Sequence, residues 1–114
     1  VITTLAGGRV LAEKHGATPP RVVALHGWGR DGGDFATVLS GLDAVSIHLP
    51  GFGPAPAPET VWGSEDYADL VAEAIAAFAP VVIVAHSFGG RVAARLAARR
   101  PELVRGLVLT GVPL

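Results

Sequence analysis

Two runs of apolar, mostly β-branched residues constrain the fold of this chain more than any other feature. They cover residues 22–25 and 81–85, and each has a proline shortly before it and a glycine shortly after it. A strand that is apolar at every position is typical of a sheet covered on both faces. Parallel sheets are covered in this way, because the helices that connect their strands pack on them. The two runs therefore predict an α/β domain.

The rest of the chain supplies further elements for such a domain. A β-hairpin is predicted where residues 3–5 and 10–13 flank Gly7 and Gly8. Further strands are predicted at residues 45–49 and 107–110, and helices at residues that begin near Phe35, Ser64 and Arg91, the first ending near Gly41. We expect one domain over residues 1–114: a mostly parallel sheet with an N-terminal hairpin and helices on both faces.

The composition argues against several classes of protein. The net charge is −1, so no strong field draws the chain to nucleic acid or to an anionic membrane. The chain has no cysteine, which excludes disulfides and thiolate metal sites. No apolar run approaches the roughly 20 residues that span a bilayer, and no signal peptide is visible. We therefore expect a cytoplasmic protein with no metal, no cofactor and no nucleic-acid or membrane partner.

The turn after residues 81–85 carries the clearest chemical signal. It reads Ala85-His86-Ser87-Phe88-Gly89-Gly90 and leads into an alanine-rich helix. A serine at the top of such a turn is strained, with its hydroxyl exposed at a helix N-terminus. Small neighbours, here Ala85 and Gly89, let strand and helix approach closely. Ser87 is therefore the candidate nucleophile, and the backbone N–H of Phe88 is a candidate oxyanion donor.

A second loop, His26-Gly27-Trp28-Gly29, follows the other buried run. The carboxyl ends of parallel strands are where reactive groups gather, so we expect this loop near Ser87. Gly27 lets the backbone turn so that the N–H of Trp28 becomes a second oxyanion donor. Trp28, Phe52 and Phe88 are candidates for an apolar substrate pocket. The alternative for Phe52 is that it only packs its own loop.

The histidines near these loops are not expected to be the catalytic base. His26 belongs to a loop that delivers backbone donors, and we expect it to brace that loop through hydrogen bonds. His86 is next to Ser87, but neighbouring strand residues point to opposite faces, so its ring does not easily reach the hydroxyl. His15 is expected at a surface turn and His48 in a strand.

Four motifs occur in an order and at spacings typical of one family. They are His26-Gly27-Trp28-Gly29, Leu49-Pro50-Gly51-Phe52-Gly53, His86-Ser87-Phe88-Gly89-Gly90 and Pro101-Glu102-Leu103-Val104. With them the chain resembles the α/β-hydrolase superfamily, in particular its small esterases and its BioH-like and haloperoxidase-like serine hydrolases. The resemblance covers the N-terminal half of a typical member. The chain departs from the pattern at Ala85, where glycine is usual, and at His48, where aspartate is common.

The resemblance implies a truncated α/β-hydrolase fold, without the family's variable cap and C-terminal strands. It also implies a serine hydrolase that cleaves a small-molecule ester, thioester or amide through an acyl-enzyme on Ser87, without a cofactor. The family's catalytic Asp and His come later, and here no acidic residue follows Glu102 and no histidine follows His86. We therefore expect the acid and base of the triad downstream, in a longer protein.

Two alternatives to this interpretation are kept. If 114 residues are the whole product, the chain is a catalytically incomplete pseudo-hydrolase or a binding module, because a serine without a base is a poor nucleophile. A nucleotide-binding α/β domain is the weaker alternative, since we expect no G-x-G-x-x-G motif after a first strand and the chain has no G-x-x-x-x-G-K-[ST] motif.

Overall fold

The two apolar runs lie side by side in one sheet. In the computed structural model, which describes residues 1–112, they form the parallel strands β3 (Val22–Leu25) and β5 (Val81–His86). Their register pairs Val22 with Val82 and Leu25 with Ala85, so both strands end at the same edge of the sheet. This edge carries the two loops that the sequence singles out.

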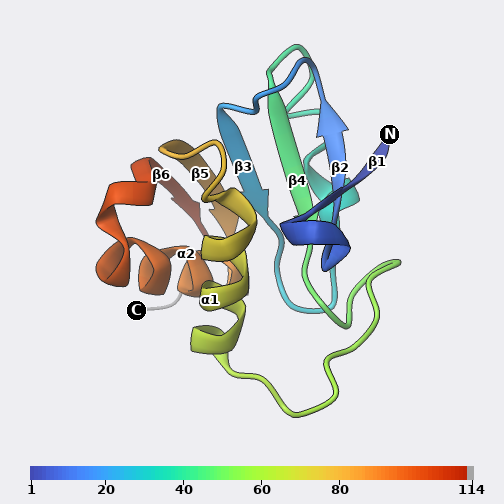
Figure 1. Cartoon of the computed structure of the whole chain (residues 1–114), viewed down its shortest axis with the longest axis vertical. Helices are drawn as coiled ribbons and strands as arrows, with labels where there is room; N and C mark the ends of the chain where they lie inside the picture. The colour runs from blue at the N-terminus through green and yellow to red at the C-terminus, as the bar shows by residue number, and fades with distance from the viewer. Residues whose placement is uncertain (113–114) are drawn as a thin grey trace.

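Four more strands complete a mixed sheet in the order β1-β2-β4-β3-β5-β6 (Figure 1). The remaining elements are β1 (Ile2–Leu5), β2 (Val10–His15), β4 (Ala44–His48), α1 (Ser64–Ile75), α2 (Phe88–Arg99), β6 (Val104–Thr110) and the 3-10 helices η1 (Ala6–Gly8), η2 (Gly32–Phe35) and η3 (Pro101–Leu103). β1 and β2 form the predicted hairpin, which joins the sheet antiparallel to β4. The four neighbouring strands β4, β3, β5 and β6 are parallel to one another, so the predicted fold class is confirmed.

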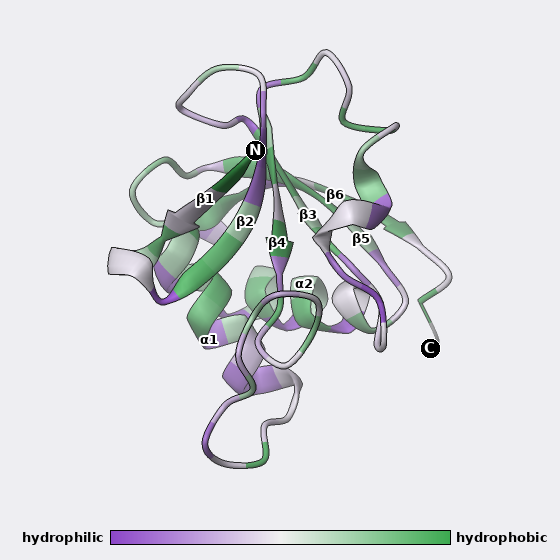
Figure 2. Ribbon diagram, turned by 90° about the vertical axis from the view of Figure 1, so that its right-hand side faces the viewer, coloured by the Kyte–Doolittle hydropathy of each residue, from purple (hydrophilic) through white to green (hydrophobic). Residues whose placement is uncertain are grey.

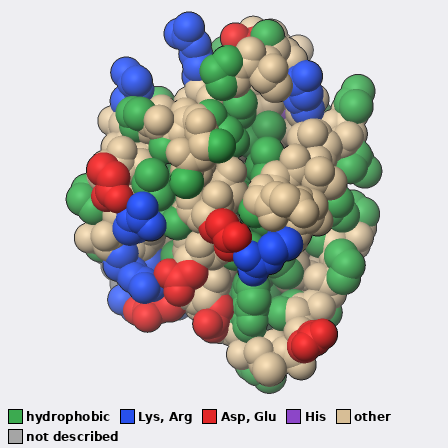
Figure 3. Space-filling view, viewed as in Figure 1, with side chains coloured by type: hydrophobic (Ala, Val, Ile, Leu, Met, Phe, Trp, Pro, Cys, Tyr) green, Lys and Arg blue, Asp and Glu red, His purple; other side chains and the backbone are tan. Residues whose placement is uncertain are grey.

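Both α-helices lie on the same side of the sheet, as Figure 2 shows. Their apolar residues form the main core with alternate residues of the strands, among them Val23, Leu25, Val45, Ile47 and Ile83. The outer surface of the helices is charged: Arg99 of α2 lies 3.1 Å from Asp69 of α1, and acidic and basic side chains gather over this face (Figure 3). The helices thus show the apolar inner stripe and polar outer face of a covering layer.

The opposite face is covered by η2 and the turns that follow it. Phe35 and Leu39 are buried there against Ala24 and Ala44. The α-helix predicted to begin near Phe35 is not formed, because residues 32–35 are a 3-10 helix and residues 36–41 are turns. The prediction of α-helices on both faces is therefore corrected to two α-helices on one face and a short 3-10 segment on the other.

The sequence of this segment explains why no α-helix forms. Gly32 and Gly33 open it, and glycine is among the poorest helix formers. Gly41 closes it with a φ of +82°, which no right-handed helix contains. Too few residues remain between these glycines for a stable helix, since short helices are marginal without extensive packing. Val38, which is at helical spacing in the sequence, is 62% exposed.

Candidate active site

Ser87 connects β5 directly to α2, and its backbone is strained. Its φ is +53° and its ψ −117°, in a region that favours glycine. The N–H of Ser87 donates to the carbonyl of Thr110 at 2.9 Å, and its own carbonyl accepts from the N–H of Gly90 at 2.9 Å. Strain of this kind costs about 1–3 kcal/mol and persists only where the surroundings enforce it. The half-buried Ser87 side chain is thus held at the end of a buried strand, at the N-terminus of a helix.

Gly89 explains how α2 can begin so close to β3. A Cβ added at Gly89 would lie 2.6 Å from the carbonyl oxygen of His26 and 2.7 Å from the carbonyl carbon of Leu25. Both contacts are with backbone atoms, which cannot rotate away as a side chain can. Only glycine therefore allows the first turn of α2 to pack on the end of β3, and this contact brings the helix N-terminus to the loop that follows β3.

Gly27 in that loop lies against the serine. A Cβ added at Gly27 would lie 3.4 Å from the Cβ of Ser87 and 3.5 Å from Cδ2 of His86. Residues 27–30 form a tight turn, in which the N–H of Arg30 donates to the carbonyl of Gly27 at 3.1 Å and Gly29 has a φ of +76°. The loops after β3 and β5 therefore meet at Ser87.

Two backbone amides in the segments that meet here have no hydrogen-bond partner among residues 1–112. Phe88 is the first residue of α2, so its N–H has no partner within the helix. The N–H of Trp28 donates to no backbone carbonyl of the described residues. The positive end of the α2 dipole adds to the attraction for negative charge beside Ser87. Developing negative charge on a substrate oxygen is the charge that such donors stabilise.

His26 is fully buried and binds the backbone on both sides. Its Nε2 accepts a hydrogen bond from the N–H of Leu49 at 3.0 Å, and its Nδ1 lies 2.8 Å from the carbonyl of Gly27. Since the Leu49 N–H can only donate, the proton is on Nδ1, which donates to Gly27. Burial lowers the pKa of His26, against the opposing effect of the Gly27 carbonyl. A neutral, enclosed ring of this kind links the loop after β3 to the end of β4.

The ring of His86 has its hydrogen-bond partner on β6. Its Nδ1 lies 2.9 Å from the hydroxyl oxygen of Thr110. His15, expected at a surface turn, is instead the last residue of β2. In residues 1–112, none of the four histidine rings has Ser87 as a hydrogen-bond partner.

The three aromatic residues expected in a substrate pocket are brought together beside the serine. The ring centroid of Trp28 lies 4.8 Å from that of Phe52 and 5.1 Å from that of Phe88, both edge to face. Trp28 is 62% exposed, so this cluster reaches the surface. Phe52 also contacts the ring of His26 at 5.4 Å, and it therefore packs its own loop as well.

Sequence reasoning missed two members of this cluster. Tyr67 of α1 contacts Phe88 at 5.6 Å, and Trp62 contacts Tyr67 at 5.1 Å. The Tyr67 hydroxyl donates to the carbonyl of Pro50 at 2.9 Å, and burial raises its pKa. In the sequence Tyr67 belongs to the apolar stripe of its helix, so nothing distinguishes it there from an ordinary core residue.

The glycine spacing of the loop after β3 does not create a dinucleotide site. Gly27, Gly29 and Gly32 follow the spacing G-x-G-x-x-G directly after β3, so the expectation that this motif is absent is wrong. In a dinucleotide site this loop opens a helix whose N-terminus holds the pyrophosphate. Here it opens only the four-residue 3-10 helix η2.

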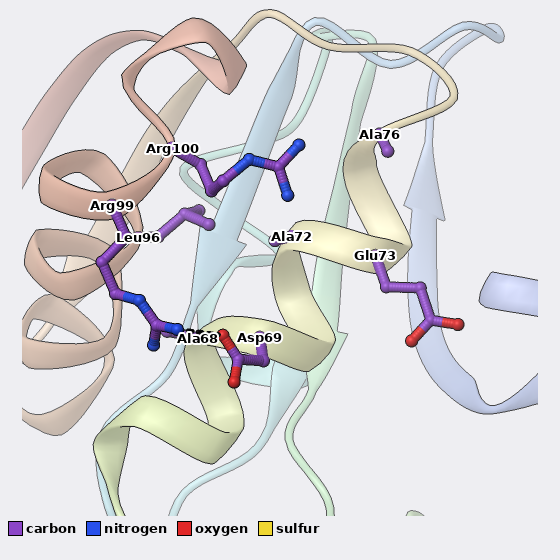
Figure 4. A pocket seen from close by; sticks show the side chains of 8 residues that line it. All are labelled: Ala68, Asp69, Ala72, Glu73, Ala76, Leu96, Arg99 and Arg100. Atoms are coloured by element: carbon purple, nitrogen blue, oxygen red, sulfur yellow. Dashed lines mark ion pairs between the residues drawn. The ribbon is translucent and has the colours of Figure 1, made fainter.

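Other features of residues 1–112 lie apart from this site. A groove of about 510 Å³ runs between α1 and α2, with the pair Arg99–Asp69 at its side (Figure 4). Its lining residues are Ala68, Asp69, Ala72, Glu73, Ala76, Leu96, Arg99 and Arg100, none of which belongs to the loops around Ser87. The described residues contain no group of three side chains suited to hold a metal ion. None of their helices has the length and apolar character that a bilayer span requires.

The chain is similar to known proteins of one family. The family described as alpha/beta hydrolase fold matches residues 20–114. The chain is 42% identical over 96 residues to the pimeloyl-[acyl-carrier protein] methyl ester esterase of Chromobacterium violaceum, a match that covers 79% of this chain and 36% of that enzyme. It is 34% identical over 116 residues to the esterase Rv0045c of Mycobacterium tuberculosis, covering 97% of this chain and 39% of that protein.

The solved structures agree with these matches. A structure of the M. tuberculosis esterase Rv0045c superposes with a TM-score of 0.84 at 32% identity, covering 96% of this chain and 39% of that one. The chain thus spans less than two fifths of the length of these relatives.

Proposed function

The chain belongs to the alpha/beta hydrolase fold family, and on this basis we propose that it forms the nucleophile-bearing part of a serine esterase, with Ser87 as the nucleophile. One observation carries the proposal: a strained serine at a strand–helix turn lies against a loop from the neighbouring strand, with Gly27 in contact with it. The esterases among the similar proteins support an ester as the substrate class.

The proposed reaction is acyl transfer to water through a covalent intermediate. The hydroxyl oxygen of Ser87 attacks the carbonyl carbon of the ester as a base takes its proton. The carbonyl oxygen becomes an oxyanion that accepts hydrogen bonds from the backbone N–H groups of Trp28 and Phe88. The C–O bond to the alcohol then breaks, and the base returns its proton to the departing alkoxide oxygen. Water attacks the acyl-serine in the same way and releases the acid.

The base in this scheme comes from outside residues 1–112. His26 and His48 use their rings to bind backbone amides inside the protein, and His86 binds Thr110. A base must lie within hydrogen-bond reach of the hydroxyl it deprotonates. We therefore propose that a histidine and its orienting acid are supplied by other residues of the protein that contains this chain.

The aromatic cluster supports an apolar group on the substrate. Trp28, Phe52 and Phe88 form an edge-to-face cluster beside Ser87, in which Trp28 is exposed and the two phenylalanines are half-buried. Apolar area of this kind favours binding of an alkyl or acyl chain over a charged group. A carboxylic ester with an apolar acyl or alcohol part is therefore the proposed substrate class.

Hydrolysis of p-nitrophenyl esters of increasing acyl length tests the proposal. The protein to assay is the product of the complete open reading frame that encodes these residues. Ser87→Ala is expected to lower the rate about a thousandfold or more, while the exposed Ser40→Ala leaves it unchanged. An active protein that keeps its rate as Ser87→Ala would rule out Ser87 as the nucleophile.

A further inference from the structure

His48 is a buried histidine with both ring nitrogens engaged. It is 3% exposed, and its Nδ1 accepts a hydrogen bond from the N–H of Gly32 at 3.1 Å. Its Nε2 lies 2.8 Å from Oε2 of Glu13. Because the Gly32 N–H can only donate, Nδ1 carries no hydrogen, and Nε2–H donates to the carboxylate. His48 is therefore held in the tautomer opposite to that of His26.

Two glycines let the backbone of two loops approach the His48 ring. A Cβ added at Gly32 would lie 3.1 Å from Cε1 of the ring, and one added at Gly53 would lie 3.1 Å from Nδ1. Gly32 ends the loop that carries Trp28, and Gly53 ends the turn that carries Phe52. The ring thus fills the space between the two loops that bound the site.

Glu13 connects the His48 ring to strand β2 of the sheet. It lies on β2, where its neighbour in register on β4 is Ser46, two residues before His48. Both partners of the Glu13–His48 pair are therefore fixed by strand pairing, whereas Gly32 lies in a segment outside the sheet. A hydrogen bond between a charged carboxylate and a buried imidazole is stronger than one between neutral groups.

We propose that Glu13 and His48 are positioning residues that hold the loop of residues 27–33, and with it the N–H of Trp28, in place against Ser87. His26 holds the beginning of the same loop through the carbonyl of Gly27, and His48 holds its end through the N–H of Gly32. The effect on catalysis rests on the proposed role of Trp28 as an oxyanion donor. The effect on the loop does not depend on that role.

Nitrogen-15 NMR of the product of the complete open reading frame tests the arrangement without an enzyme assay. The expected result is hydrogen on Nε2 of His48 and on Nδ1 of His26, with slow hydrogen exchange at the Gly32 amide. Hydrogen on Nδ1 of His48 would overturn the proposal, since Nδ1 could then not accept from Gly32.

Variants of Glu13 test the positioning role, because they leave the buried ring in place. Glu13→Ala is expected to speed exchange of the Gly32 amide about tenfold and to slow labelling of Ser87 by a fluorophosphonate about as much, because the phosphoryl oxygen of the probe occupies the oxyanion position. Glu13→Gln keeps an acceptor for Nε2–H, so we expect both the slow exchange of the Gly32 amide and the rate of Ser87 labelling to be largely retained. Glu73→Ala removes a carboxylate from an exposed ion pair with Arg9 and serves as the matched control.

The two proposals fail in different ways. If Ser87 of the unaltered protein is not labelled at all, the proposed function fails, and amide exchange at Gly32 alone decides the positioning role. If Ser87 is labelled and Glu13→Ala changes neither exchange nor labelling, the positioning role is overturned and the proposed function stands. Faster exchange with unchanged labelling supports the hold on the loop but overturns the claim that this hold positions the N–H of Trp28 for Ser87.

Discussion

Gly27 lies directly against Ser87: a Cβ added at the glycine would be 3.4 Å from the Cβ of the serine. The two residues follow β3 and β5, which are parallel neighbours and end at the same edge of the sheet. This contact brings the loop that contains Trp28 and the N-terminus of α2 together at Ser87. The proposed chemistry depends on that arrangement.

A methyl group at Gly27 is expected to impair function more than folding. Gly27→Ala makes contacts of 3.4 Å with Ser87 and 3.5 Å with His86, which close packing can accommodate with small shifts. We expect the free energy of unfolding to fall by less than about 1 kcal/mol and Ser87 labelling to slow about tenfold, because the methyl group crowds the approach of an acyl group. Urea unfolding and fluorophosphonate labelling measure the two effects, and unchanged labelling would contradict the geometry.

A methyl group at Gly89 is expected to destabilise the fold. Its contacts are with the backbone of Leu25 and His26, which cannot give way without moving β3. Gly89→Ala should lower the free energy of unfolding by about 3 kcal/mol or more, at the upper end for overpacking. Gly106→Ala is the control, since a Cβ there meets nothing within 4 Å. Equal urea midpoints for the two variants would contradict the close contact of Gly89 with the backbone of β3.

The strain at Ser87 predicts that glycine there is more stable than alanine. Ser87→Ala keeps a Cβ at a φ of +53°, whereas Ser87→Gly removes it. Relief of strain exceeds the entropic cost of glycine, so we expect Ser87→Gly to be more stable than Ser87→Ala by about 1 kcal/mol. Thermal or urea unfolding measures the difference. A more stable alanine variant would mean that the turn is relaxed.

His26 predicts a loss of stability in mild acid. Burial lowers its pKa in the folded state, so below about pH 6.5 the unfolded chain binds a proton at this residue that the folded chain does not. Its contribution to stability is therefore complete above pH 6.5 and declines as the pH falls toward its folded pKa. As the pH falls below 6.5 the unaltered chain should lose more stability than His26→Gln, which cannot titrate. Parallel pH dependence of the two in urea unfolding would remove His26 as the cause.

The sheet and its helices were the predictable part of this structure. Residues 22–25 and 81–85 are apolar at every position, which is typical of strands that pack on both faces, although Val82 and Val84 of β5 are only half-buried. The segment after Phe35 was mispredicted because its apolar spacing resembles a helix, while Gly32, Gly33 and Gly41 favour tighter turns. Periodicity reports which residues are buried, and in a short glycine-bounded segment it does not distinguish the two conformations.

The neighbours of the site residues were less predictable than the residues themselves. A strand–turn–helix pattern points to Ser87, because the strain and the small neighbours are local properties of the sequence. The partnership of Glu13 with His48 depends on the register of β2 against β4, which no local pattern specifies. The same holds for Tyr67, which reaches Phe88 only because α1 packs beside α2.

Covalent labelling with a fluorophosphonate, followed by peptide mapping by mass spectrometry, tests the central claim most directly. In the product of the complete open reading frame, we expect one adduct, on the peptide that contains Ser87, which is lost in Ser87→Ala and kept in Ser40→Ala. An adduct on another residue, or a catalytically active protein whose Ser87 stays unmodified, would contradict the assignment of Ser87 as the nucleophile.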